Sequence, residues 1–144
     1  METIVNKIAN SSLITLDLEE TLIHPEEIKT LDIKDFLFQG LILKEKDFRQ
    51  MLKDTDWTRY NESIVAIINS QDAIIPTWAF MLLSTVLKEN CLYADLCQPK
   101  EVLERFYLHQ INLLEVTQFE DKRIVLKGCG KMAIPQSIYT AITT

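Results

Sequence analysis

The chain has 144 residues, of which 47% are hydrophobic and 25% charged, and its formal net charge is −6 at pH 7. This length fits one domain, and the composition is too apolar for a disordered chain. The acidic balance, without a basic run interleaved with aromatic residues, argues against binding to nucleic acid. No stretch approaches the roughly 20 apolar residues that cross a bilayer, so we expect no interaction with a membrane.

The N-terminus and the cysteines bear on the cellular compartment. Residues 1–12 have neither the long apolar core nor the small-residue cleavage site of a signal peptide. Three cysteines is an odd count, and no CxxC pair occurs among them. We therefore expect reduced thiols and a cytoplasmic protein.

In the first part of the chain, residues 13–18 alternate in the manner of a strand. The acidic residues 19–27 are typical of a loop. Residues 28–38 fit either a short strand or a helix, with Asp32 and Asp35 as candidate caps, so residues 1–42 form a less defined strand and loop region. Residues 43–52 then place apolar and charged side chains on opposite sides of a helix.

From residue 64 onward, strands and helices alternate. Residues 64–68 are all apolar and fit a strand that is buried on both faces. Pro76, Pro99 and Pro135 each suit the start of a helix, and strands are expected at 91–94 and 124–127. The helix after Pro99 should turn Leu113 inward. We predict one α/β domain over residues 1–144, with a mostly parallel sheet of about four or five strands flanked by helices.

Two segments of the chain nearly repeat each other. Residues 64–80 read IVAIINSQDAIIPTWAF, and residues 124–139 read IVLKGCGKMAIPQSIY. Each passes from an Ile-Val strand through a small polar loop to a proline that opens a helix. Units of one design usually place their loops at the same edge of a sheet, where open α/β folds bind ligands.

The second loop, Lys127 to Lys131, holds the one candidate for a catalytic residue, Cys129. Nearby lysines and a following helix N-terminus would favour the thiolate, so Cys129 is a candidate nucleophile, metal ligand or part of an anion-binding loop. The alternative is a tight turn around a buried small side chain. Gly128 and Gly130 are two of only three glycines, which indicates a backbone that needs room or a positive φ.

The first loop, Asn69 to Asp72, is the matching part of the predicted site. Ser70 and Asp72 either cap the next helix or turn outward toward a ligand. The predicted ligand-binding residues are therefore Asn69, Ser70, Asp72, Lys127, Cys129 and Lys131. Helix N-termini and lysines suit a small anion or a cofactor whose identity the residues do not specify.

The metal-ligating residue types show no pattern of a metal site. His24 and His109 lie far apart in the sequence, and zinc sites normally show close pairs of ligands. The acidic group Asp17, Glu19 and Glu20 lacks the spacing of a calcium loop. We expect these carboxylates to be solvated and predict no metal.

Three segments carry a resemblance to a known family. They are DIKDFLFQGLILKEKDFR (Asp32 to Arg49), DAIIPTWAFMLL (Asp72 to Leu83) and VLKGCG (Val125 to Gly130). They resemble an uncharacterised family of small bacterial proteins, domain of unknown function 2480, and the similarity covers nearly the whole chain. The resemblance implies a bacterial cytoplasmic protein and no established activity. It also implies a shortened C-terminus, because the relatives continue past the last helix with a tail that carries another cysteine.

Two functions remain open at this point. One is binding of a small anion or cofactor at the carboxyl edge of the strands, with or without catalysis. The other is a non-catalytic interaction or scaffold protein that acts as a homodimer. A large apolar surface patch on Leu37, Phe38, Leu41 and Ile42 would favour the second function.

Overall fold

A computed structural model describes residues 13–128 and 130–144. It confirms the α/β class, because five strands pair in parallel and helices connect them. The chain divides into two compact units, which are described separately here. The core unit is His24–Phe106, and the terminal unit is Met1–Ile23 with Tyr107–Thr144. Helix α4 (Val102–Asn112) contributes residues to both.

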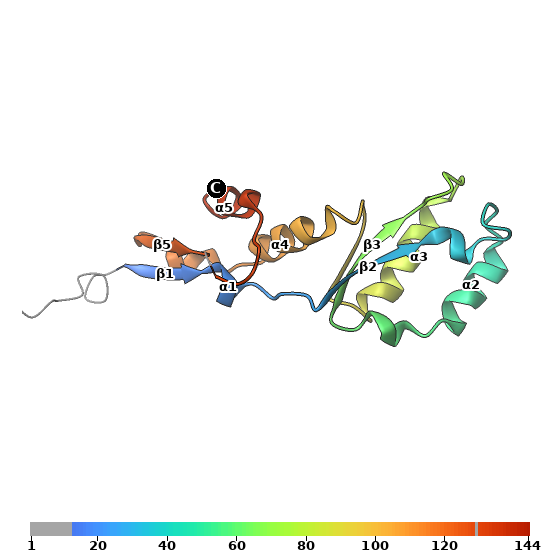
Figure 1. Ribbon diagram of the computed structural model, residues 1–144, viewed down its shortest axis with the longest axis horizontal. Helices are drawn as coiled ribbons and strands as arrows, with labels where there is room; N and C mark the ends of the chain where they lie inside the picture. Colours follow the sequence, from blue (N-terminus) through green and yellow to red (C-terminus); the bar gives the residue numbers. More distant parts are fainter. Residues whose placement is uncertain (1–12, 129) are drawn as a thin grey trace, which may run out of the picture. The chain divides into compact units, whose positions relative to one another are not determined.

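The core unit contains a three-stranded parallel sheet in the order β2-β3-β4. Its strands are β2 (Glu27–Asp32), β3 (Ser63–Ile68) and β4 (Tyr93–Leu96). Helices α2 (Glu45–Asp54) and α3 (Thr77–Lys88) connect successive strands (Figure 1). Two short 3-10 helices, η1 (Ile33–Phe36) and η2 (Trp57–Tyr60), follow β2 and α2. The central strand β3 is buried on both faces, as its unbroken apolar sequence predicts.

The hydrophobic core of this unit lies between the sheet and the two connecting helices. Phe48 of α2 and Leu83 of α3 are fully buried there, with Val65 of β3. The rings of Phe36 and Trp57 stack at 6.0 Å, and the indole Nε1 of Trp57 donates to the Leu52 carbonyl at 2.8 Å. The 3-10 helices are thereby held against the core.

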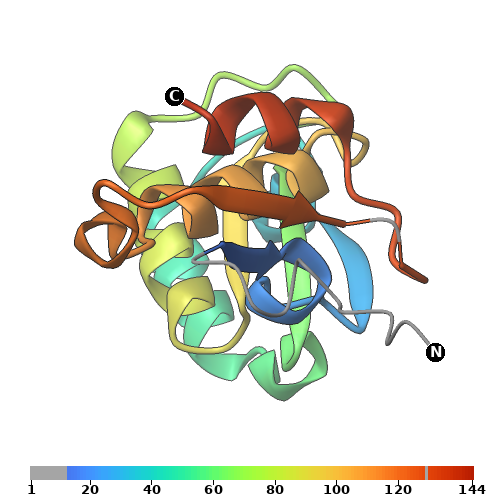
Figure 2. The ribbon, with the colours of Figure 1, turned by 90° about the vertical axis from the view of Figure 1, so that its left-hand side faces the viewer.

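The terminal unit contains a two-stranded parallel sheet. Strand β1 (Ile14–Asp17) pairs with β5 (Ile124–Lys127), although about 110 residues separate them in the sequence (Figure 2). Helix α1 (Leu18–Thr21) follows β1, 3-10 helix η3 (Val116–Phe119) precedes β5, and helix α5 (Gln136–Ile142) follows it. Side chains that are fully buried in this unit include Leu18 and Ile138.

Several local expectations change. The five described strands divide between two sheets instead of lying in one, and a short helix occupies part of the predicted loop 19–27. Leu113 is 71% exposed, so its predicted inward position is wrong, because α4 ends one residue before it. No helix among the described residues has the length and apolar character that a membrane span requires. The number of domains stays a prediction.

Candidate functional site

The carboxyl edge of the core sheet brings Asp32 and the loop after β3 together. Asp32 ends β2 and lies opposite Ile68, the last residue of β3. Its Oδ1 accepts the backbone N–H of Ser70 at 3.3 Å and that of Lys34 at 3.1 Å. Its other oxygen lies 3.4 Å from the Lys34 ammonium. The sequence suggested Asp32 only as a cap; its contact with the loop depends on strand pairing, which the sequence does not show.

Hydrogen bonds explain the ionisation of Asp32. Burial disfavours the charged carboxylate, but hydrogen bonds from Ser70 and Lys34 outweigh burial and lower the pKa of Asp32 below its ordinary value. Asp32 is therefore a fixed anion at neutral pH. An anionic ligand beside Ser70 would meet this charge.

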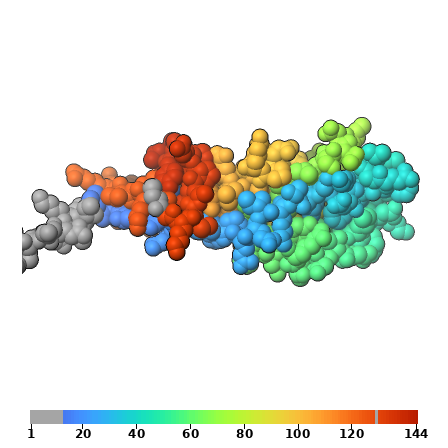
Figure 3. All heavy atoms as spheres, viewed as in Figure 1, coloured from blue at the N-terminus to red at the C-terminus, as the bar shows by residue number. Residues whose placement is uncertain are grey.

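The side chain of Asn69 holds its own loop in shape. Its Nδ2 donates to the Ala73 carbonyl at 2.8 Å, and its Oδ1 accepts the Ala73 N–H at 3.2 Å. Asp72 completes the turn with a positive φ of 48°. The loop projects from the surface as the yellow-green segment of Figure 3. The amide of Asn69 thus stabilises the loop with one of its two N–H groups and one lone pair of its oxygen.

Neither Ser70 nor Asp72 caps the following helix, so that alternative is wrong. Helix α3 begins at Thr77, with Pro76 at the N-cap position and no hydrogen bond from a capping side chain. The proline terminates an extended segment that includes Ile74, which is 95% exposed. The exposed side chain of Asp72 therefore remains available to a partner.

The second loop of the predicted site places lysines beside carboxylates. The Lys127 ammonium lies 3.4 Å from Oδ2 of Asp17, and the backbone N–H of Lys131 donates to Oε1 of Glu19 at 3.0 Å. A Cβ at Gly130 would overlap the Glu19 carboxylate. The position therefore requires a residue without a side chain, because the Glu19 carboxylate occupies the space beside Gly130. These acidic neighbours reduce the attraction of the loop for an anion.

Cys129 lies outside the described residues, so its predicted roles stay predictions. The two loops of the proposed site belong to different units and follow strands of different sheets. The structure brings Asn69, Ser70 and Asp72 together in one loop, and Lys127 and Lys131 together in another. A single site formed by both loops stays a prediction.

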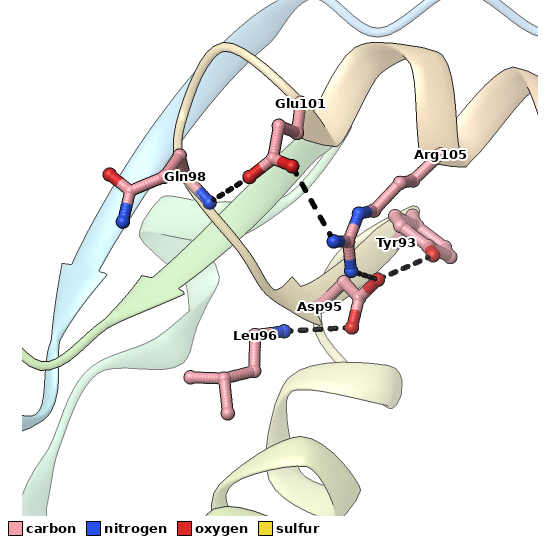
Figure 4. A network of polar contacts seen from close by, with 6 residues as sticks. All are labelled: Tyr93, Asp95, Leu96, Gln98, Glu101 and Arg105. Atoms are coloured by element: carbon pink, nitrogen blue, oxygen red, sulfur yellow. Dashed lines mark hydrogen bonds and ion pairs between the residues drawn. The ribbon is translucent and has the colours of Figure 1, made fainter.

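A second polar cluster occurs where β4 leads into α4 (Figure 4). Nη1 of Arg105 lies 2.8 Å from Oδ2 of Asp95, which also accepts the Tyr93 hydroxyl at 3.2 Å. Glu101 lies 3.7 Å from Arg105 and accepts the backbone N–H of Gln98 at 2.8 Å. Sequence reasoning missed this cluster: the i, i+4 spacing of Glu101 and Arg105 indicates one contact, but no spacing rule indicates that Arg105 meets Asp95. The bond between Arg105 and Asp95 holds the first turns of α4 against strand β4.

The tyrosine of this cluster and the two described cysteines, which lie near it in the sequence, stay protonated at neutral pH. Burial, together with the Asp95 carboxylate, raises the pKa of Tyr93 to about 12. Burial also raises the pKa of the Cys97 thiol, although Arg105 partly opposes the effect. Burial raises the pKa of Cys91 as well. Neither described thiol is therefore activated as a nucleophile.

No group of three or more His, Cys, Asp or Glu side chains in the described ranges could hold a metal ion. A family model described as "Protein of unknown function (DUF2480)" matches residues 2–144. No curated protein and no solved structure matches the chain.

Proposed function

Because the chain belongs to the DUF2480 family, for which the match supplies no activity, we propose from the geometry alone that it is a non-catalytic interaction protein that forms a homodimer. The observation that carries the proposal is an exposed apolar turn, residues 38–42. Phe38, Leu41 and Ile42 are 46%, 55% and 56% exposed. Three large apolar side chains in one five-residue turn mark a contact surface more than scattered exposure does.

The apolar turn is held in place by hydrogen bonds. The Phe38 N–H donates to the Ile42 carbonyl at 2.8 Å, and the Gly40 N–H donates to the Leu37 carbonyl at 3.2 Å. Gln39 and Gly40 both have positive φ, 50° and 71°, as a tight reversal requires. The turn therefore presents its side chains in a fixed arrangement, which lowers the entropy lost on binding.

The residues of the apolar turn permit a second copy of the chain as the partner. The Lys44 ammonium lies 3.4 Å from the centroid of the Phe38 ring, beside the apolar turn. Each copy carries a net charge of −6, so the contact at the turn must offset the overall repulsion between two copies. The turn itself carries no carboxylate that would repel the copy.

The exposed area supports only a weak dimer. Completing the burial of these half-exposed side chains in both copies contributes about 5–9 kcal/mol, at about 1.5–3 kcal/mol per fully buried apolar side chain. Association costs an estimated 4–15 kcal/mol in lost freedom. The most favourable balance, about −5 kcal/mol, corresponds to a dissociation constant of about 0.2 mM, so we expect a dimer that is populated between about 0.1 mM and a few millimolar protein.

Sedimentation equilibrium over that concentration range tests the proposal. The wild type should show a reversible monomer–dimer equilibrium, and Leu41→Ser with Ile42→Ser should shift it to monomer. Leu113→Ser is the matched control, because Leu113 is also highly exposed but lies outside the turn. A wild type that stays monomeric, or a dimer that the double variant leaves unchanged, would contradict the proposal.

The cellular setting forms part of the same proposal. The family resemblance supports a bacterial origin, and the free Cys91 and Cys97 are compatible with the reducing cytoplasm. The net charge of −6 argues against nucleic acid as the partner.

A further inference from the structure

A cleft in the core unit, separate from the apolar turn and from both predicted loops, has a lining suited to a small anion. It encloses about 410 Å³ between β2, η1 and η2 and is lined by Lys29, Thr30, Leu31, Asp35, Phe36, Arg59 and Tyr60. This volume falls in the range of ligand pockets. Two cations, Lys29 and Arg59, and one carboxylate, Asp35, line the cleft, and Glu27 beside it pairs with Lys29.

The fold brings the two cations together from segments thirty residues apart. The Lys29 ammonium donates to the backbone carbonyl of Arg59. Glu27 balances Lys29, because its Oε2 lies 3.0 Å from the ammonium. Among the described residues, no carboxylate lies within ion-pair distance of Arg59, but the neighbouring Asp56 carboxylate still attracts it. Oδ1 of the nearby Asp56 accepts hydrogen bonds from the N–H of Thr58 at 3.0 Å and from the Thr58 hydroxyl at 2.6 Å.

The guanidinium of Arg59 is also fixed in orientation. Its Nη2 donates to the Tyr60 hydroxyl at 2.9 Å, and its central carbon lies 4.9 Å from the centroid of the Tyr60 ring. The remaining N–H groups keep the fork geometry that matches carboxylate and phosphate oxygens. A guanidinium that is held in place and has no carboxylate in direct contact needs little reorganisation to bind an anion.

We propose that this cleft binds a small molecule that carries one carboxylate or phosphate group on a flat apolar body. Arg59 holds the oxyanion beside Lys29, and the body lies over the floor of the cleft, where Leu31 and Phe36 expose only 3% and 6% of their surface. Among the described residues β2 pairs only with β3, so the outward N–H groups of this edge strand add donors.

Titration with benzoate and with phenyl phosphate, followed by ¹H–¹⁵N NMR, tests the site in the full chain. Both probes should shift the signals of Arg59 and Thr30. Arg59→Met should weaken binding about tenfold or more, the effect of losing a charge-assisted hydrogen bond. Arg59→Lys keeps the charge without the fork and should weaken binding less. Inorganic phosphate should bind more weakly than phenyl phosphate, because it lacks the apolar body.

Arg49→Met is the matched control. Arg49 also lies over an aromatic ring, 5.2 Å from the Trp78 centroid, but it is paired with Glu45 at 3.0 Å and does not line the cleft. Its replacement should leave affinity unchanged. Absence of shifts at Arg59 and Thr30 with both probes would overturn the proposal, as would equal affinity in Arg59→Met and Arg49→Met. The site does not depend on the dimer, so Leu41→Ser should bind the probes normally.

Discussion

Replacing Asp32 with alanine should destabilise the core unit by about 2 kcal/mol. The substitution removes the side-chain cap of η1, which is worth about 1 kcal/mol. It also removes the charged acceptor for the Ser70 N–H; at 3.3 Å and partly buried, this bond falls near 1 kcal/mol, below the usual range for charged acceptors. Asp32→Asn keeps an acceptor oxygen and an equally good cap, so it should cost less than about 1 kcal/mol.

Urea unfolding followed by tryptophan fluorescence measures the change in unfolding free energy of the core unit. The only two tryptophans, Trp57 and Trp78, both lie in the core unit. Asp35→Ala is the matched control, because Asp35 is the exposed carboxylate of the same 3-10 helix. A difference of less than about 0.5 kcal/mol between Asp32→Ala and Asp35→Ala would refute the assignment of Asp32 as the link between β2 and the loop.

The pH dependence gives an independent check on Asp32. The folded state lowers its pKa, so the unfolded chain takes up the proton first as the pH falls. The stabilisation by the charged form is complete above the unfolded pKa near 4 and disappears as the pH falls through the folded pKa. The difference in unfolding free energy between the wild type and Asp32→Asn should therefore shrink as the pH falls below about 5.

Three further outcomes follow from burial and close contact. Leu83→Ala should lower the free energy of unfolding by about 2–5 kcal/mol, whereas Met81→Ala, at a 65% exposed position of the same helix, should change it by less than about 0.5 kcal/mol. Gly130→Ala should displace the Glu19 carboxylate, so Glu19→Ala in the same chain should recover part of the lost stability in a double-mutant cycle. Cys97 should be alkylated more slowly at pH 7 than a free thiol, as measured by mass spectrometry of its peptide, because burial raises its pKa; alkylation at the rate of a free thiol would contradict this.

The sequence predicted those elements whose signals are local. The strand at 124–127 was predicted with its exact bounds, and a helix follows both Pro76 and Pro135. These patterns depend on apolar periodicity and on the missing N–H of proline, and both act within a few residues. The acidic segment after β1 forms helix α1 because the side chain of Asp17 accepts the Glu19 N–H at 2.9 Å, which its loop-like composition conceals.

Long-range pairing was not predictable in the same way. Nothing in the residues near Ile14 indicates that they pair with Ile124. The assumption of one sheet placed the loops after β3 and β5 at a common edge, but these strands lie in different sheets. Whether the predicted residues of these loops form a ligand site stays a prediction. The partners of their polar groups, Asp32 and Glu19, come from distant parts of the chain, where spacing carries no information.

The apolar turn and the anion cleft lie at opposite ends of one short segment, which decides whether they communicate. Phe36 lines the cleft and Phe38 begins the turn, with the buried Leu37 between them. Phe36 is itself buried and stacks on Trp57 with an angle of 6° between the rings, so the core fixes this segment. A site transmits binding only through an element that has two arrangements, and close packing here favours one. We therefore expect phenyl phosphate to leave the dimer dissociation constant unchanged. A shift of that constant with probe concentration would instead show that η1 moves, and linkage would require the dimer to bind the probe with a correspondingly different affinity.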